Sequence, residues 1–163
     1  MAKYIIAEPE GIPSTGLAID GPSFSFSLVL GTPGNDTLLG QRGGDVILGF
    51  GGDDLIRGRG GSDVIVGGTD SDTLYGGGGS DIFVFKPGDG FDKIADFQPG
   101  DRILLLGVPE NETGFIPTPN GLNGPFIGID VVYSTPDNGQ GVVTLAGLKN
   151  TDFQWVQDAV IYG

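Results

Sequence analysis

Aspartate recurs at every ninth position between residues 36 and 81, and these carboxylates are the side chains with the clearest capacity for chemistry. A carboxylate can transfer protons as a general acid or base, or it can bind a cation. The sequence contains no His and no Cys, so it lacks the commonest general base and any disulfide, Cys–zinc site or thiol nucleophile. A regular array of carboxylates without such partners favours cation binding over catalysis.

The aspartates belong to a longer repeat. Residues 31–84 divide into six units of nine residues, each with Gly at position one, Asp at position six and a large apolar residue at position eight. Position four is Gly in five of the six units, and Asp70 is the exception. After a two-residue insertion at 85–86, two weaker units keep the Asp and the apolar residue in phase. The eight units are GTPGNDTLL, GQRGGDVIL, GFGGDDLIR, GRGGSDVIV, GGTDSDTLY, GGGGSDIFV, PGDGFDKIA and DFQPGDRIL.

The unit predicts a tight turn followed by a short strand. Glycine permits positive φ, so the first half of each unit can turn sharply and aim its carbonyls at one centre. The last three residues form a strand whose middle residue faces inward. Two units then make one flattened coil of 18 residues, with a strand on each side and a turn at each end. The inward residues are expected to be Leu38, Ile47, Ile56, Ile65, Leu74, Phe83, Ile94 and Ile103.

Stacked coils place the turn of unit n directly over the turn of unit n+2, so their aspartates converge. Two carboxylates that close cannot both stay ionised without a cation between them. A hard ion that takes six to eight oxygens suits this gap, whereas magnesium prefers a small octahedron and keeps its waters. The spacing therefore predicts calcium.

The units resemble the G-G-x-G-x-D-x-U-x nonapeptide of RTX (repeats-in-toxin) proteins, whose turns bind calcium. The resemblance covers residues 31–104, nearly half of the chain. It implies an all-β fold, a right-handed parallel β-roll with 18 residues per coil, between an N-terminal strand cap at 1–30 and a C-terminal β cap at 105–163.

Carried over residue by residue, the resemblance also implies the metal ligands. The pairs of units n and n+2 give up to six calcium ions, which add twelve positive charges to a formal charge of −13 and leave about −1. Asp53, Asp70 and Asp89 lie out of phase and are expected to be solvated. Thr32, Gln41, Phe50 and Arg59 stand where the family has its second glycine, which puts the backbone of the first four turns in doubt. The implied ligand carboxylates are Asp36, Asp45, Asp54, Asp63, Asp72, Asp81, Asp92 and Asp101, and the implied turn backbone is that of Gly43, Gly52, Gly61, Gly68, Gly77 and Gly79.

Both ends of the chain are expected to cap the roll, because an open coil leaves unpaired strand edges. Lys3–Ala7 and Phe24–Leu30 are predicted strands, and Asp130–Ser134 with Gly141–Leu145 is a predicted hairpin around Asn138-Gly139. Residues 142–153 are similar to the segment that closes the β-roll in serralysin-type proteases. Residues 158–163 resemble the uncleaved type I secretion signal of RTX proteins, although an ordinary final strand is the alternative interpretation.

The outward residues predict which face of the roll is covered. Odd-numbered units show a mixed surface, but seven of the eight outward residues of the even units are aliphatic. A monomer rarely leaves such a patch exposed, so we expect residues 105–163 to fold over it, or a partner such as a second copy to cover it. The central residues of this patch are Val46, Val64, Ile82, Val66 and Val84.

These features favour a small exported calcium-binding protein that folds on meeting extracellular calcium. An enzyme is not expected, because HExxH and Ser-His-Asp sites need His and no G-x-S-x-G elbow occurs. The acidity argues against nucleic-acid binding, and no apolar run is long enough to span a membrane. No N-terminal secretory h-region is present, so export is expected to follow a type I route. The alternative function is a cell-surface or matrix adhesion module that uses the aliphatic face or the C-terminal aromatic residues.

Overall fold

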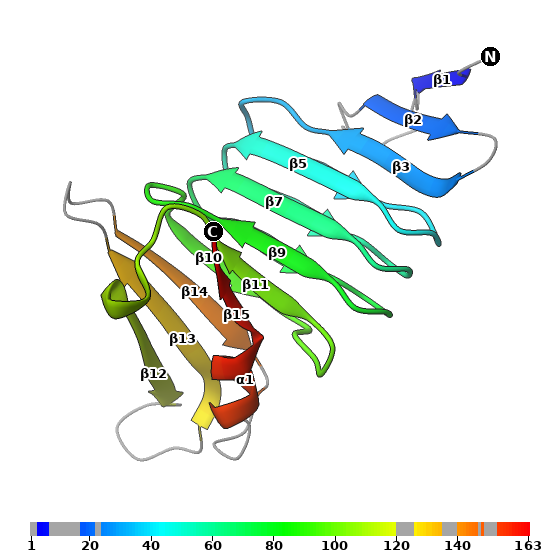
Figure 1. Cartoon of the computed structure of the whole chain (residues 1–163). Helices are drawn as coiled ribbons and strands as arrows, with labels where there is room; N and C mark the ends of the chain where they lie inside the picture. The colour runs from blue at the N-terminus through cyan, green and yellow to red at the C-terminus, as the bar shows by residue number, and fades with distance from the viewer. Residues whose placement is uncertain are drawn as a thin grey trace.

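The structure is a computed structural model that describes residues 3–6, 17–21, 24–119, 126–134, 140–146, 148 and 153–163. Two sheets lie one behind the other in the view of Figure 1, and the core lies between them. The even sheet has the strand order β1-β2-β3-β5-β7-β9-β11-β15 and contains the strands of the even-numbered units. The odd sheet has the order β12-β13-β14-β10-β8-β6-β4 and contains the strands of the odd-numbered units.

The repeat forms stacked parallel coils. Val46 lies beside Val64 in the even sheet, and Leu55 lies beside Thr73 in the odd sheet, so each unit stacks on the unit two places along. The stacking continues across the insertion, where Ile82 pairs with Arg102. The predicted parallel β-roll is therefore confirmed. Its odd-sheet strands are β4 (Thr37–Leu39), β6 (Leu55–Arg57), β8 (Thr73–Tyr75) and β10 (Phe91–Ile94), and its even-sheet strands are β5 (Val46–Gly51), β7 (Val64–Thr69), β9 (Ile82–Phe85) and β11 (Arg102–Leu105).

Within the roll, the core is built mainly from the position-eight side chains of both sheets, and it continues into the C-terminal region. All eight predicted inward residues are at most 1% exposed, from Leu38 in the first unit to Ile103 in the last. Strand side chains alternate between faces, so one apolar residue flanked by outward neighbours is enough to define the inner face. Burying each of these apolar side chains stabilises the fold by about 1.5–3 kcal/mol.

An antiparallel meander begins the chain. It consists of β1 (Lys3–Ile6), β2 (Leu17–Gly21) and β3 (Phe24–Leu30), and β3 then pairs in parallel with β5. Of these strands, β1 and β3 correspond to predicted segments, whereas β2 was not predicted. The mixed sequence of β2, which includes Asp20 and Gly21, gives no strong strand signal.

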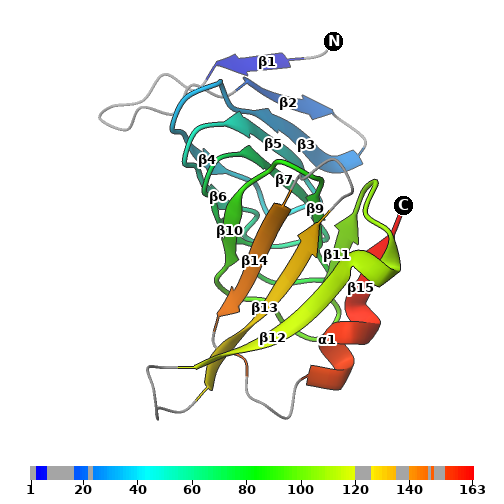
Figure 2. The ribbon, with the colours of Figure 1, turned by 90° about the vertical axis from the view of Figure 1, so that its left-hand side faces the viewer.

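The C-terminal region extends both sheets beyond the last coil, as Figure 2 shows. The strands β12 (Thr113–Pro119), β13 (Phe126–Ser134) and β14 (Gln140–Ala146) are antiparallel, and β14 continues the odd sheet beside β10. The predicted hairpin is thus present as β13–β14, while Asn138 and Gly139 lie outside the described residues. The even sheet is continued by β15 (Val160–Tyr162), which pairs with β11.

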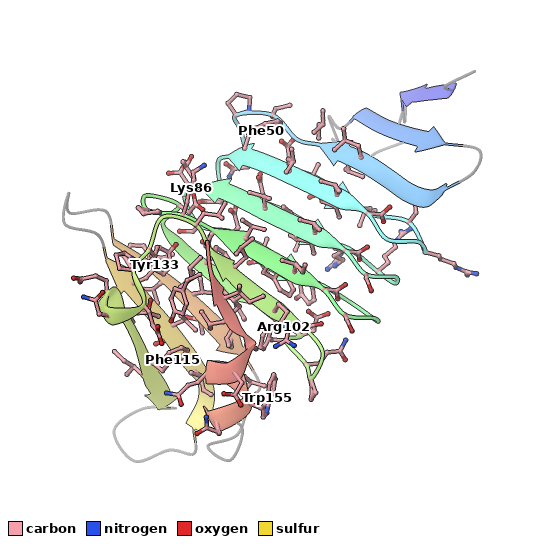
Figure 3. The ribbon with its side chains drawn as sticks, viewed as in Figure 1. Phe50, Lys86, Arg102, Phe115, Tyr133 and Trp155 are labelled. Atoms are coloured by element: carbon pink, nitrogen blue, oxygen red, sulfur yellow. The ribbon has the colours of Figure 1, made fainter. Side chains whose placement is uncertain are left out.

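Among the described residues of this region are two short helical segments, the 3-10 helix η1 (Glu110–Glu112) and the helix α1 (Phe153–Ala159). The helix places the Trp155 ring on that of Phe97, with centroids 5.6 Å apart and planes 7° apart, and so closes the end of the core (Figure 3). Phe97 in turn packs against Phe83 of the core. Neither helical segment was predicted from the sequence.

The prediction that residues 105–163 cover the aliphatic face of the even sheet is wrong. The strands of that region join the edges of β10 and β11, and the five central residues of the patch remain half-buried in the monomer. The last coil presents a row of backbone N–H and C=O groups, and pairing them removes a larger penalty than covering aliphatic side chains does. The face of the even sheet is consequently aliphatic and not covered by the residues that the structure describes.

Candidate metal centre

A ladder of hydrogen bonds joins the position-six aspartates. In each predicted pair, Oδ1 of the Asp in unit n+2 accepts the backbone N–H of the Asp in unit n, at 2.8–3.0 Å. The turns of odd and even units therefore form two separate columns, one at each end of the coil. The six joined pairs are Asp36/Asp54, Asp45/Asp63, Asp54/Asp72, Asp63/Asp81, Asp72/Asp92 and Asp81/Asp101.

The geometry explains why position one is glycine. A Cβ on Gly58 would meet Oδ2 of Asp63, the aspartate of its own unit, and would lie 2.7 Å from the carbonyl oxygen of Gly76 in the turn above. Gly49 has the same relation to Asp54 and to the carbonyl of Gly67. The carboxylate thus occupies the space that a side chain at position one would need.

From the third unit to the seventh, positions two and four both have positive φ. Gly61, for example, has a φ of 117°, and a Cβ there would lie 2.5 Å from the carbonyl oxygen of Gly43. Phe50 and Arg59 adopt the same conformation without being glycine, each with a φ of 79°, at the cost of strain, whereas Thr32 and Gln41 in the first two turns do not have positive φ. Of the implied turn glycines, Gly52, Gly61, Gly68, Gly77 and Gly79 have positive φ, and Gly43 does not.

The first two turns differ from those that follow. Oδ2 of Asp36 accepts the N–H of Thr32, and Oδ2 of Asp45 accepts that of Gln41, both at 2.5 Å. Their second oxygens are therefore satisfied within their own units. At the start of the even column, Ser27 donates both its N–H and its hydroxyl to Oδ1 of Asp45, at 2.9 and 2.6 Å. Ser27 of β3 thus supplies the N–H that later aspartates of the column receive from the aspartate two units before them.

Farther along, the second oxygens have no hydrogen-bond partner. The aspartates concerned are at most 3% exposed, and a buried carboxylate oxygen without a partner is costly. The exception is Asp101, whose Oδ2 accepts the N–H of Gln98 at 3.0 Å. These unpartnered atoms are Oδ2 of Asp54, Asp63, Asp72, Asp81 and Asp92.

Burial raises the pKa of the same carboxyl groups. Loss of solvation is the main cause, and the charge of a neighbouring ladder aspartate adds to it. The pKa rises to about 6 for Asp63, about 7 for Asp72 and about 8 for Asp92. The pKa of Asp101 rises to about 6, and those of Asp54 and Asp81 are also raised, again mainly by burial. Such groups ionise readily only if a cation replaces the lost water.

The donor set suits calcium. In the described part of the chain no three acidic side chains gather into one metal-binding group, so an ion between turns would have two carboxylates and would complete its shell with backbone carbonyls. Calcium accepts this mixture of oxygen ligands in irregular geometry. The unpartnered Oδ2 atoms and the glycine backbone around them fit that ion, and no His or Cys competes for a softer metal.

Two acidic residues in the degenerate units were not recognised from the sequence. Asp89 is 1% exposed, so the expectation that it is solvated is wrong, whereas Asp53 and Asp70 are exposed as expected. Asp96 occupies position one of the last unit, and its two oxygens accept the N–H groups of Gly76 and Gly77 at 2.9 Å. The sequence carried a signal for each: Asp89 is acidic at position three, which is variable in the other units, and Asp96 is acidic at position one, which is Gly in the first six units.

Comparisons with known proteins agree with this geometry. The family model for the RTX calcium-binding nonapeptide repeat matches residues 30–65 and 57–92. The AlgE6R3 subunit of the mannuronan C5-epimerase of Azotobacter vinelandii, a solution structure, superposes with a TM-score of 0.52 at 24% identity, over 95% of this chain and 86% of that one. The extracellular lipase LipA of Serratia marcescens gives a TM-score of 0.41 at 14% identity, over 83% of this chain and 40% of the lipase chain.

A comparison with curated protein sequences finds no match. At 24% identity, the likeness to the epimerase subunit concerns the fold alone. The identification of the turns as calcium-binding repeats rests on the family model. None of the helices in the described segments is long and apolar enough to cross a membrane. The part of the chain that matches the RTX calcium-binding nonapeptide repeat is residues 30–92, which contain the first six turns and most of the seventh unit.

Proposed function

We propose that the protein binds up to six calcium ions between its stacked turns and that this binding drives the folding of the roll. The observation that carries the proposal is the set of buried, unpartnered Oδ2 atoms along the aspartate ladder. The ligands would be the eight position-six aspartates, Asp36 to Asp101, together with backbone carbonyls of the glycine turns. A calcium ion would neutralise carboxylates whose pKa burial has raised.

The size of the effect follows from mass action. Calcium modules of extracellular proteins have a Kd of roughly 10⁻⁴–10⁻³ M. At a free concentration of about 100 times Kd, each independent site would stabilise the fold by about 2.7 kcal/mol. Several sites together would then match the whole stability of a small domain, about 5–15 kcal/mol.

Far-UV circular dichroism during a calcium titration tests the proposal. We expect the β signal and the melting temperature to rise together with calcium and to fall when EGTA is added. Asp63→Asn should weaken this response, because Asp63 is hydrogen-bonded to a ladder partner on each side. Asp70→Asn is the matched control, because Asp70 is exposed and outside the ladder. An unchanged spectrum and melting temperature in excess EGTA would contradict calcium-driven folding.

Stoichiometry tests the arrangement of the sites. Asp63 lies between two other ladder aspartates, whereas Asp36 has one such neighbour in the family pattern. Asp63→Asn should therefore remove about twice as many calcium ions as Asp36→Asn, measured by calorimetry on the full chain. Equal losses would count against ions shared between units n and n+2.

We further propose that the protein acts outside the cell and without catalysis, and that it leaves the cell unfolded by a type I route. Residues 158–163 lie at the end of α1 and in β15, where Ala159 and Val160 are buried. A signal in this segment would be accessible only before folding, which low calcium inside the cell would delay. Secretion of the full chain and of Val160→Asp can be compared in a host with a type I exporter. Equal secretion would argue that this segment is not the signal.

The aliphatic face of the even sheet supports a second candidate function, association with another copy of the chain. Its outer column, Leu30, Leu48, Val66, Val84, Leu104 and Ile161, runs over six neighbouring strands. With strands about 16 Å long on average and about 24 Å across six strands, two such faces would bury about 800 Å² in total. That area is below the usual size of a stable specific interface, so a weak dimer is expected.

Sedimentation velocity in calcium tests this association. Val64→Lys, at the centre of the face, should abolish the dimer. Thr73→Lys, at the equivalent half-buried position on the odd sheet, should leave it intact. A monomer at millimolar concentration would exclude the second candidate.

A further inference from the structure

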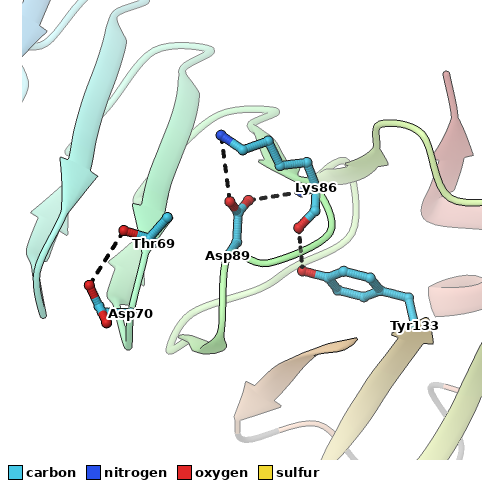
Figure 4. Close-up of polar contacts among 5 residues, drawn as sticks. All are labelled: Thr69, Asp70, Lys86, Asp89 and Tyr133. Carbon is cyan, nitrogen blue, oxygen red and sulfur yellow. Dashed lines mark hydrogen bonds and ion pairs between the residues drawn. The ribbon is translucent and has the colours of Figure 1, made fainter. Parts of the chain in front are cut away.

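The turn at residues 86–92 contains a buried carboxylate outside the aspartate ladder. Asp89 is 1% exposed, and its Oδ2 accepts the backbone N–H of Lys86 at 2.8 Å (Figure 4). Its Oδ1 has no hydrogen-bond partner and lies 3.7 Å from Nζ of Lys86. The Lys86 side chain is 57% exposed, so its ammonium group remains largely hydrated and neutralises Asp89 poorly.

A second unpartnered oxygen belongs to the same turn. Asp92 is the last aspartate of the odd column, and its Oδ1 accepts the N–H of Asp72 at 3.0 Å while its Oδ2 is buried without a partner. The charge of Asp89 contributes to the raised pKa of both Asp72 and Asp92, which indicates that the three carboxylates are electrostatic neighbours. Among the described residues, the Lys86 ammonium group forms an ion pair with Asp89 alone.

The roll ends at this point. No ninth unit stacks on the 87–92 turn, and β14 pairs with β10 instead, with the N–H of Val142 donating to the carbonyl of Gly90 at 3.1 Å. Beside the turn lies the buried Tyr133 of β13, whose hydroxyl donates to the carbonyl of Lys86 at 3.3 Å. The C-terminal sheet therefore replaces the next coil but brings no ladder carboxylate to Asp92.

We propose that Asp89 supplies this missing carboxylate and that Asp89 and Asp92 together bind an additional calcium ion at the end of the odd column. The site rests on the proposed calcium binding of the turns and extends it beyond the family pattern, because Asp89 stands at position three of its unit. An ion here would join the last odd turn to β13, since Tyr133 holds the carbonyl of Lys86. The Lys86 ammonium group would compete with the ion for Oδ1 of Asp89.

Calcium titration of the full chain by calorimetry tests the site with three variants. Asp89→Asn should bind one calcium ion fewer than the unmodified protein, or bind it about tenfold more weakly, because one of two carboxylates is lost. Asp70→Asn, which changes an exposed aspartate in the preceding odd turn, should bind the same number as the unmodified protein. Lys86→Met should bind calcium more tightly at this site, because the competing charge is removed while the stem of the side chain is kept.

The outcomes separate this inference from the proposed function. If Asp63→Asn lowers the stoichiometry and Asp89→Asn does not, the Asp89 site is excluded and calcium binding by the ladder stands. If neither the unmodified protein nor any variant binds calcium, the proposed function itself fails. Should Asp89→Asn not fold, a comparison of terbium luminescence between the unmodified protein and Tyr133→Phe decides. Tyr133→Phe should reduce the emission sensitised by tyrosine, and an unchanged emission would overturn the assignment of an ion beside this turn.

Discussion

Raising the pH from about 5 to about 8 is expected to weaken the metal-free roll and to strengthen the calcium-loaded one. The folded-state pKa values of Asp63, Asp72 and Asp92 lie above the ordinary aspartate value of 3.8. The folded chain therefore holds protons more tightly than the unfolded chain does. By linkage, the free energy of unfolding without metal falls as the pH rises from about 4 through about 8.

The magnitude can be worked for one residue. A pKa raised from 3.8 to about 7 at Asp72 corresponds to about 4 kcal/mol of lost stability once the group is ionised in both states. The shifts at Asp63, Asp92 and Asp101 act in the same direction. A small domain has about 5–15 kcal/mol of stability in all. The metal-free protein is therefore expected to be largely unfolded near pH 8 and to gain structure as the pH falls toward 5.

Thermal melts by circular dichroism measure the effect. Metal is best removed with a chelating resin, because soluble chelators lose affinity in acid, and a parallel series contains saturating calcium. Calcium requires ionised carboxylates, so the melting temperature of the loaded protein should rise from pH 5 to pH 8, opposite in sign to the metal-free series. Equal melting temperatures at both pH values without metal would refute the claim that burial raises the pKa of the ladder carboxyl groups.

Four substitutions, one of them a control, test the coil itself. Gly58→Ala should destabilise the calcium-loaded protein by about 2 kcal/mol or more, because its Cβ meets the Asp63 carboxylate. The control Gly78→Ala has no atom within 4 Å of the added Cβ and should change the stability by no more than about 0.5 kcal/mol. Similar unfolding midpoints for both variants would contradict the packing of position one. Arg59→Gly should raise the melting temperature, because it relieves strain of about 1 kcal/mol at a φ of 79°, and a lower value would mean that the Arg59 side chain stabilises the turn. Ile65→Ala should cost about 2–5 kcal/mol in denaturant unfolding, since Ile65 is fully buried, and a loss below 1 kcal/mol would place it outside the core.

The central architecture was predictable because three positions of the unit carry independent physical constraints. Gly58 and its equivalents leave room for a carboxylate, Asp63 accepts a hydrogen bond from the preceding stacked turn, and Ile65 points into the core. Each constraint recurs with the same period, so one sequence sufficed to define the coil and the register of unit n on unit n+2. The paired aspartates of the ladder follow from that register alone.

The ends were less predictable because no repeat constrains them. The aliphatic face of the even sheet suggested a covering layer, but hydrophobic pattern does not reveal that the backbone edges of β10 and β11 also need partners. The helix α1 is only seven residues long, too short for a clear helical period. Asp89 was misjudged because the insertion at 85–86 changes the turn, and the resulting hydrogen bond to the N–H of Lys86 draws its carboxylate inward.

The two donors of Ser27 bear on a problem that nearly identical repeats create for a folding chain. Coils of similar sequence can align one step out of place, and each slipped alignment keeps most of the apolar contacts and most of the ladder. Ser27 stands before the first coil, and its N–H and hydroxyl reach Oδ1 of Asp45 only in the native alignment. At the other end, Asp96 accepts the N–H groups of Gly76 and Gly77, a pairing that no other unit can reproduce. Because the hydrogen bonds of Ser27 and Asp96 differ from those of the repeated units, they favour the native register over registers shifted by one coil.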